Sequence, residues 1–321
     1  MRVRAIAFAL LIASAVFVVE NVAIVVLFPT LPRVTTDFSA TYLRRTLDAY
    51  ASGPSRVVLL GDSVLWGYRL AAVDTAPSLL ARAGCRCANL AFKSANPPNY
   101  YLLARLLVQR RVPVAVAVVE INEQVLNAAN STYASVHPGV AALAAPYLHA
   151  DERASLSAAG SPVPAPQRWD AMLSAAVPLY GMRTDLRETF YGEPPAAPPP
   201  DVLEGLYDLS PLDERNVGVA FLARTLATFH AAGVPVLAFL TPVNHRLMHA
   251  FIDVREYRAN LAYVRRLCER NGARVLDLDG AFPPELFFDN DHLTARGQRR
   301  LAQRLRRAID TTAPRSGAFA T

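Results

Sequence analysis

The chain contains 321 residues, of which 52% are hydrophobic and 19% are charged, with 24 Pro, 15 Gly and 3 Cys. This composition excludes an intrinsically disordered chain, a collagen-like fibre and a small disulfide-stapled domain, and the length suits one large α/β domain with appendages. The formal net charge is +6, and nearly all the cations are arginines, since Lys93 is the only lysine. The arginines are scattered without a nucleic-acid-binding signature, so no nucleic-acid partner is predicted, whereas a basic surface suits anionic envelope polymers or lipid headgroups.

The N-terminus carries a long apolar segment, AIAFALLIASAVFVVENVAIVVLF, over residues 5–28. As a helix this segment would be roughly 36 Å long, enough to cross the hydrocarbon core of a bilayer with some tilt. Arg2 and Arg4 precede it, so the positive-inside rule places the N-terminus in the cytoplasm. Residues 1–30 are therefore predicted to be a transmembrane signal-anchor of a single-pass membrane protein whose remaining chain is extracytoplasmic, in the periplasm or outside the cell.

Two other interpretations of this segment stay open. Ala13 and Ala15 form an A-x-A pattern typical of a signal-peptide cleavage site, and a segment that is hydrophobic all round could also be a buried helix. Glu20 interrupts the apolar run, and we expect it either to face a partner membrane protein or to be protonated without a partner.

The chain then alternates between short apolar runs and helical patterns. A juxtamembrane linker with a short helix is expected over residues 31–55, before the first strand. Strands are predicted at 56–60, 85–92, 112–121, 234–241 and 273–280, and helices at 62–83, 98–110, 213–232, 253–270 and 294–309. Continuous apolar strands separated by helices indicate a parallel sheet covered on both faces. The expected fold is an α/β flavodoxin-like three-layer sandwich with a five-stranded parallel sheet, over residues 56–310.

The alternation breaks down between residues 123 and 212, a stretch rich in Ala and Pro. It is too long for a simple connecting loop, so we expect a cap inserted into the sheet domain. The small and polar tail over residues 311–321 is expected to be flexible.

The cysteines and histidines give no metal signature. Cys85 and Cys87 are expected to share one face of a strand, a poor geometry for a mutual bridge, and neither they nor Cys268 is assigned a function. His245 and His249 have the spacing of a helical metal pair but no evident third ligand. No metal and no cofactor is predicted.

A first candidate for chemistry is Gly61-Asp62-Ser63, which follows the strand at 56–60 and opens a helix. Parallel sheets bind ligands at the carboxyl ends of their strands, and a helix N-terminus offers free N–H groups. A serine here can present its Oγ to a substrate while its own N–H faces a developing oxyanion. By itself the motif is equally typical of helix capping.

A second candidate is Asp289-Asn290-Asp291-His292, which precedes the C-terminal helix. An acid and a histidine three residues apart can turn toward one site, where the acid orients the ring and the imidazole takes a proton. Helix capping is again the alternative.

Further polar residues follow other strands. Ser94 follows the second strand, Asn122 the third and Asn244 the fourth. Candidate substrate contacts are Asp62, Trp66, Asn244 and Arg246.

GDSVLWG, the Asn after the third strand and DNDHLTARG together resemble the SGNH, or GDSL-type, serine hydrolase and acyltransferase superfamily. The resemblance covers about 56–122 and 213–310. It implies that Ser63 is the nucleophile, His292 the general base and Asp289 its orienting partner. It also implies an oxyanion hole made of the Ser63 N–H, the Asn122 side chain and a backbone N–H of the second block, where Ser94 stands in place of the usual glycine. The third block reads Glu120-Ile121-Asn122-Glu123 instead of G-x-N-D.

The N-terminal anchor before such a domain also looks like envelope acyl-transfer proteins, such as the D-alanyl-lipoteichoic-acid biosynthesis protein and the alginate O-acetylation proteins. The expected function is therefore an extracytoplasmic serine esterase or O-acyltransferase with an acyl-serine intermediate. Its expected partners are an ester-bearing envelope glycan or lipid, the membrane and a membrane-bound O-acyltransferase. The alternative is a non-catalytic membrane-anchored domain that binds polymer or scaffolds an acylation complex.

Overall fold

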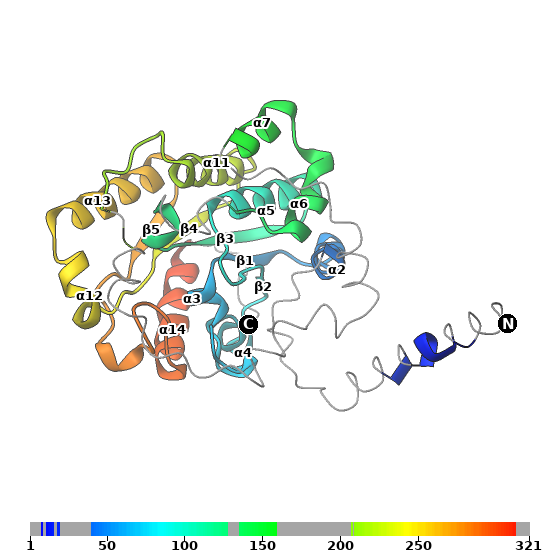
Figure 1. Ribbon diagram of the computed structural model, residues 1–321, viewed down its shortest axis with the longest axis horizontal. Helices are drawn as coiled ribbons and strands as arrows, with labels where there is room; N and C mark the ends of the chain where they lie inside the picture. The colour runs from blue at the N-terminus through cyan, green and yellow to red at the C-terminus, as the bar shows by residue number, and fades with distance from the viewer. Residues whose placement is uncertain are drawn as a thin grey trace.

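The sheet at the centre of the molecule has five parallel strands in the order β2-β1-β3-β4-β5 (Figure 1). The strands span Arg56–Leu60 (β1), Cys87–Asn89 (β2), Val114–Ile121 (β3), Val236–Leu240 (β4) and Arg274–Asp277 (β5). The predicted α/β fold with a five-stranded parallel sheet is confirmed, and the strand order is that of flavodoxin-like doubly wound sheets. Because the strands are parallel, all their carboxyl ends meet at one edge of the sheet.

The structure is a computed structural model, and it describes residues 40–127, 135–158, 207 and 209–312, with residues 8, 11–15, 18 and 19 near the N-terminus. Most of the predicted signal-anchor and nearly all of the predicted tail lie outside these residues, as does much of the predicted insertion. In the part of the chain that is described, no helix is both long enough and apolar enough to cross a membrane.

The central strands are apolar on both sides because helices cover both faces of the sheet. In β1, Val58 and Leu60 pack into the core on one face, and Val57 and Leu59 pack into the core on the other. All four side chains are fully buried, so continuous apolar strands are stabilised by burial on either side rather than on one.

The helices form two layers around the sheet (Figure 1). One face is covered by α2 (Ala40–Ala51), α5 (Pro97–Gln109), α11 (Val217–Ala231) and α13 (Arg255–Arg270). The other face is covered by α3 (Ser63–Trp66), α4 (Ala76–Arg82) and α14 (Ala295–Thr312). A third, smaller cluster forms around α12 (His245–Ile252) and the start of α13.

The single helix predicted after the first strand is broken in the structure. It consists of α3, the 3-10 helix Ala72–Asp74 (η1) and α4. Gly67 ends α3 with a left-handed φ of 89°, and a Cβ there would lie 2.4 Å from Cγ2 of Thr75. The nucleophile candidate therefore stands at the start of a single helical turn.

The short helix expected within the linker over residues 31–55 is present as α2, and it packs against the folded domain. Residues Ala40–Ala51 form α2, and its Leu43 and Leu47 are completely buried in the core. The folded domain thus begins at least as early as residue 40, because an amphipathic helix covers apolar surface that the sheet layer would otherwise expose.

The described part of the predicted insertion is helical. It contains the 3-10 helices Glu123–Leu126 (η2) and Ala145–Tyr147 (η3) and the helices α6 (Pro138–Ala144) and α7 (Ala150–Ala158). Helix α6 packs against α2 and α5, so this part joins the helical layer on one face of the sheet.

The expectation that Cys85 and Cys87 do not pair is wrong. They form a disulfide, with Cα atoms 5.3 Å apart. The expected strand geometry fails because β2 begins only at Cys87, and Cys85 lies before the strand, directly after a turn that ends at Gly84, whose φ is 89°. Cys268 is a buried free thiol, and burial raises its pKa to about 12.

Candidate active site

Ser63 stands where the carboxyl end of β1 turns into α3. Asp62 is the N-cap of this helix, and its carboxylate accepts a hydrogen bond from the Val64 N–H at 2.9 Å. The cap fixes the helical turn so that the Ser63 side chain points to the sheet edge, where its Oγ lies 2.9 Å from Nε2 of His292.

His292 is held by the carboxylate of Asp289. Its Nδ1 lies 2.9 Å from Oδ2 and 3.0 Å from Oδ1 of Asp289, and its backbone N–H donates to Oδ1 at 2.9 Å. Since the acid bonds to one ring nitrogen and the serine to the other, the structure joins Asp289, His292 and Ser63 in one chain of hydrogen bonds. This is the arrangement in which an acid orients an imidazole to act as a general base toward a hydroxyl.

The loop that carries Asp289 and His292 is tied to the fourth strand. Asn244 caps α12, its backbone N–H donates to the Asn290 carbonyl at 2.8 Å, and its side-chain amide donates to the Asp289 carbonyl at 3.0 Å. The structure therefore places Asn244, a predicted substrate contact, as a buried support of the loop.

Gln298 is a buried residue whose part in the site the sequence analysis did not predict. Its amide donates to the Val64 carbonyl of α3 at 2.7 Å, and its Oε1 accepts from the Ala76 N–H of α4 at 2.8 Å. Helix α14, which follows the His292 loop, is thereby fastened to the helix that begins at Ser63. No local sequence signal marks this role, since the partners are more than 200 residues away.

Glu120 is a second residue that the sequence analysis noted only as a neighbour of Asn122. It is completely buried at the end of β3, and its Oε2 accepts from the backbone N–H groups of Asp62 and Leu65 at 3.1 Å each. A side chain on Gly61 would collide with this carboxyl group, because its Cβ would lie 2.2 Å from the Glu120 Oε2. Burial raises the pKa of Glu120 well above its usual value, and the negative charge of Asp62 adds to the effect.

Asp291 brings a further carboxylate to the histidine. Its Oδ1 lies 3.3 Å from Nδ1 of His292, and its Oδ2 accepts from the amides of Asn122 at 2.8 Å and Gln124 at 3.0 Å. The Gln124 amide also donates to the Tyr207 hydroxyl at 2.9 Å. From the sequence alone, no role beside the histidine is predicted for Asp291.

These contacts change the pKa values of His292, Asp291 and Asp289. Burial works to lower the pKa of His292, but the carboxylates of Asp291, Asp289 and Asp62 outweigh it and raise the pKa to about 9. Burial raises the pKa of Asp291 to about 6. For Asp289, burial works in the raising direction, but the hydrogen bond and charge of His292 prevail and lower its pKa. The surrounding carboxylates therefore favour the protonated form of the imidazole.

Two backbone N–H groups at this edge have no acceptor among the described residues. They belong to Ser63, at the start of α3, and to Ser94, in the loop after β2. That loop lies beside the end of β1, since the Phe92 N–H donates to the Gly61 carbonyl at 3.2 Å. Ser94 has a left-handed φ of 61°, a backbone conformation that glycine adopts more readily than other residues.

Asn122 is engaged differently from the predicted oxyanion donor. Its amide nitrogen donates to Oδ2 of Asp291 at 2.8 Å and to Oδ2 of Asp62 at 3.2 Å, and its Oδ1 accepts from the Gln124 N–H. Both amide hydrogens therefore point to carboxylates in this structure. Among the described residues, the backbone N–H groups near the Ser63 hydroxyl that have no acceptor are those of Ser63 and Ser94.

The other predicted substrate contacts are spread around the site. Asp62 is buried as the cap of α3, Trp66 is half-buried at its end, and Arg246 is exposed on α12. Tyr68 is the aromatic residue that meets the triad, with its ring centroid 4.6 Å from that of His292. Lys93 lies over the same tyrosine ring, 5.2 Å from its centroid.

Among the described residues, one group of side chains could hold a metal ion, and it lies around His292. Ligand atoms of Asp289, Asp291 and His292 lie within 4.8 Å of one another. Two of these residues are already joined to each other and to Ser63, so a metal there would compete with the triad hydrogen bonds. His245 and His249 do not converge: the first pairs with Asp279 at 2.8 Å, and the second contacts the Arg246 carbonyl.

Comparison with known proteins adds no assignment, since no protein-family model and no curated protein matches the chain.

Proposed function

We propose that this chain is an extracytoplasmic serine esterase or O-acyltransferase that works through an acyl-Ser63 intermediate. The observation that carries the proposal is the chain of contacts from Asp289 through His292 to Ser63, in which both side-chain links measure 2.9 Å. The resemblance of the two sequence blocks to the SGNH superfamily supports the same assignment of nucleophile, base and orienting acid.

The first half of the reaction forms the acyl-enzyme. His292 takes the proton of the Ser63 hydroxyl as Oγ attacks the ester carbonyl, and Asp289 stabilises the resulting imidazolium. The Ser63 and Ser94 N–H groups are the proposed donors to the oxyanion, each worth about 2.7–4 kcal/mol by comparison with proteases. The tetrahedral intermediate then expels the alcohol, which takes the proton from His292, and the acyl group remains on Ser63.

The second half transfers the acyl group. His292 removes a proton from water or from a sugar hydroxyl, whose oxygen attacks the acyl carbon and releases Ser63 with its proton restored. If water is excluded from the acyl-Ser63 carbonyl, the acyl group passes to the sugar hydroxyl; if water has access, the acyl-enzyme is hydrolysed. Tyr68, against the imidazole, is positioned to line the approach to the acyl group.

The proposed setting is the outer side of a membrane. The apolar segment over residues 5–28 and the arginines before it are the basis for a single-pass anchor with the domain outside the cytoplasm. The proposed substrate is an ester of an envelope glycan or glycolipid, and a membrane-bound O-acyltransferase is the proposed partner where the reaction is a transfer.

Ester hydrolysis tests the proposal. The wild-type chain and a Ser157→Ala variant, which changes an exposed serine of α7, are expected to hydrolyse p-nitrophenyl acetate equally. Ser63→Ala should lose at least about 10³-fold in kcat/KM, because in the part of the chain that the structure describes only the Ser63 hydroxyl is hydrogen-bonded to His292. Equal rates for all three proteins would refute the catalytic assignment and favour a non-catalytic scaffold.

A second assay separates transfer from hydrolysis. The acyl-enzyme is formed from the same ester, with and without an oligosaccharide acceptor, and the acceptor is analysed by mass spectrometry. Acylated oligosaccharide is the result expected of an O-acyltransferase, whereas free acid released at full rate with an unmodified acceptor identifies an esterase.

A further inference from the structure

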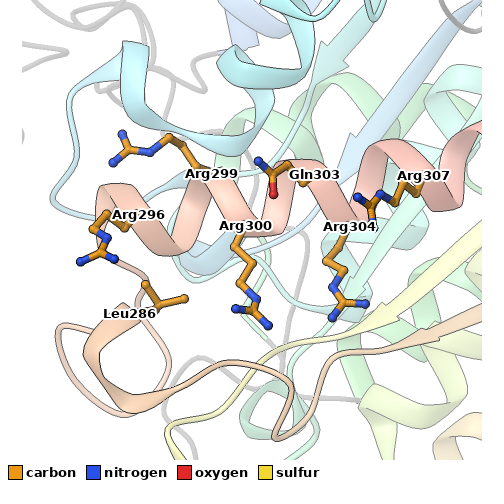
Figure 2. Close-up of a pocket in the computed structure, with 7 residues that line it drawn as sticks. All are labelled: Leu286, Arg296, Arg299, Arg300, Gln303, Arg304 and Arg307. Carbon is orange, nitrogen blue, oxygen red and sulfur yellow. The ribbon is translucent and has the colours of Figure 1, made fainter.

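The exposed side of α14 forms a strongly basic groove next to the catalytic loop. Its cavity volume is about 500 Å³. The polar side chains that line it are Arg296, Arg299, Arg300, Gln303, Arg304 and Arg307. Figure 2 shows Arg296, Arg300 and Arg304 extending from one side of α14 on successive turns, whereas Arg299 and Gln303 extend from its other side.

The groove begins at the base of the loop that holds the triad. Leu286 lines one end of it beside Arg296 (Figure 2), and these two residues flank the loop of Asp289 and His292 in the sequence. The loop is closed at its base because the Thr294 N–H donates to the Leu286 carbonyl at 2.8 Å. A ligand lying along α14 would therefore approach the triad from one end of the groove.

The charge of the groove is not neutralised within the described residues. No carboxylate there lies within 4 Å of the Arg296, Arg299, Arg304 or Arg307 guanidinium groups, and Arg300 instead lies over the Phe282 ring, 5.4 Å from its centroid. Like charges four residues apart on a helix repel one another. Arg300 also donates to the Ala281 carbonyl at 3.4 Å, but this contact leaves its positive charge uncompensated. The like charges therefore destabilise the free protein, and an anionic ligand would relieve the repulsion.

The shape and chemistry of the groove favour an extended ligand with carboxylates at regular intervals. From Arg296 to Arg307 the helix rises roughly 16 Å. In the row of Arg296, Arg300 and Arg304, successive arginines are four residues apart, about 6 Å along the helix axis, which is comparable to the length of one pyranose residue. Guanidinium groups bind planar carboxylates in a bidentate way that lysine cannot reproduce. A concave groove also suits a single chain better than the flat surface of a membrane.

We propose that the α14 groove binds an acidic polysaccharide whose sugar carboxylates pair with its arginines, and that the bound chain leads a neighbouring sugar ester or hydroxyl to Ser63. This inference rests on the proposed function, since it names the substrate class of the same site. The groove would hold the polymer in register, while the triad performs the acyl transfer.

Binding in the absence of chemistry tests this proposal. The full-length chain with Ser63→Ala, in non-ionic detergent, is titrated with fluorescein-labelled oligogalacturonate, and binding is followed by fluorescence anisotropy at several salt concentrations. A groove variant adds Arg296→Gln, Arg299→Gln and Arg304→Gln, which change exposed side chains. A matched control adds Arg255→Gln, Arg266→Gln and Arg270→Gln on α13, where three exposed arginines lose the same charge.

We expect the groove variant to bind at least about tenfold more weakly, the control to bind within about twofold of the parent, and the difference to shrink as salt is raised. Replacing the same three groove residues by Lys should give intermediate affinity, because charge is kept and bidentate pairing is lost. Equal weakening in groove and control variants would overturn the proposal. So would preferential binding to polyglycerol phosphate or to anionic phospholipid vesicles, which would identify a phosphate polymer or a membrane as the occupant.

The outcome is separable from that of the proposed function. If binding depends on the groove but Ser63 of the wild-type chain does not react, the polysaccharide-binding site is supported and the proposed enzymatic function is refuted. A reactive Ser63 without groove-dependent binding would refute only the polymer site.

Discussion

The charge of Asp291 should set the pH at which His292 becomes a base. The imidazole must be neutral to accept the Ser63 proton, and its pKa in the site is about 9. For the wild-type chain, kcat/KM for ester hydrolysis should therefore increase about tenfold per pH unit below this value and reach a plateau above about pH 9.

Asp291→Asn removes one of the charges responsible while keeping an oxygen that can accept from Asn122 and Gln124. At the observed 3.3 Å, Coulomb's law gives an upper limit of roughly 5 kcal/mol for a fully ionised pair at an effective dielectric constant of about 20. Because Asp291 itself has a pKa of about 6 and Asp289 remains, we expect a smaller effect. The pKa of His292 should fall by about one to two pH units, to about 7–8.

The pH–rate profile measures this directly. Hydrolysis of p-nitrophenyl acetate is followed from pH 5.5 to 10.5, with the rate of Ser63→Ala subtracted at each pH. At pH 7 the neutral fraction of His292 should increase from about 1% to about 10–50% in the Asp291→Asn variant. Asp151→Asn, an exposed acid on α7, serves as the control and should leave the profile unchanged. Superimposable profiles for wild type and Asp291→Asn would refute the electrostatic argument.

Substitutions at three further residues test the supports of the site. Asp289→Asn should lower kcat about 10⁴-fold, because the amide no longer fixes the tautomer of the histidine, and a loss below tenfold in steady-state kinetics would argue against a triad. Glu120→Gln should preserve the fold, since Gln still accepts from the Asp62 and Leu65 N–H groups, whereas Glu120→Ala should lower the free energy of unfolding by about 2–5 kcal/mol in urea titrations. Because the pKa of Glu120 is raised in the folded protein, its contribution to the free energy of unfolding is complete at acid pH and is lost as pH rises. The Glu120→Gln variant should therefore become more stable relative to the wild type as the pH is made alkaline. Gln298→Leu should cost about 2–5 kcal/mol and lower kcat/KM, because it leaves a carbonyl of α3 and an N–H of α4 buried without partners; a cost below about 0.5 kcal/mol would contradict that role.

The elements that could be predicted are those with a local signal. Strands such as β1 and β4 are unbroken apolar runs, and the helices between them show amphipathic or apolar patterns. Parallel strands bring their carboxyl ends to one edge, so residues after different strands had to converge there. This is why the approach of Ser63 to His292 could be expected from two stretches far apart in the chain.

The residues that were missed act through long-range contacts. Nothing in the sequence around Glu120 shows that its carboxyl group accepts two N–H groups of the Ser63 turn, and nothing around Gln298 shows that it joins two helices. The misjudged pairing of Cys85 and Cys87 depended on where β2 begins, a boundary that a short strand leaves undefined in the sequence. The partners of such side chains are determined by tertiary packing, so they can be identified only in the folded structure.

Peptide mapping of a fluorophosphonate adduct shows whether Ser63 is the reactive nucleophile. The probe phosphonylates a serine only where a base removes the hydroxyl proton, and mass spectrometry then identifies the modified residue. We expect the probe to modify one residue, Ser63. Labelling should be lost in the His292→Ala variant and retained in the Ser157→Ala control. Unlabelled Ser63 in the folded wild-type chain, or labelling that persists without His292, would contradict it.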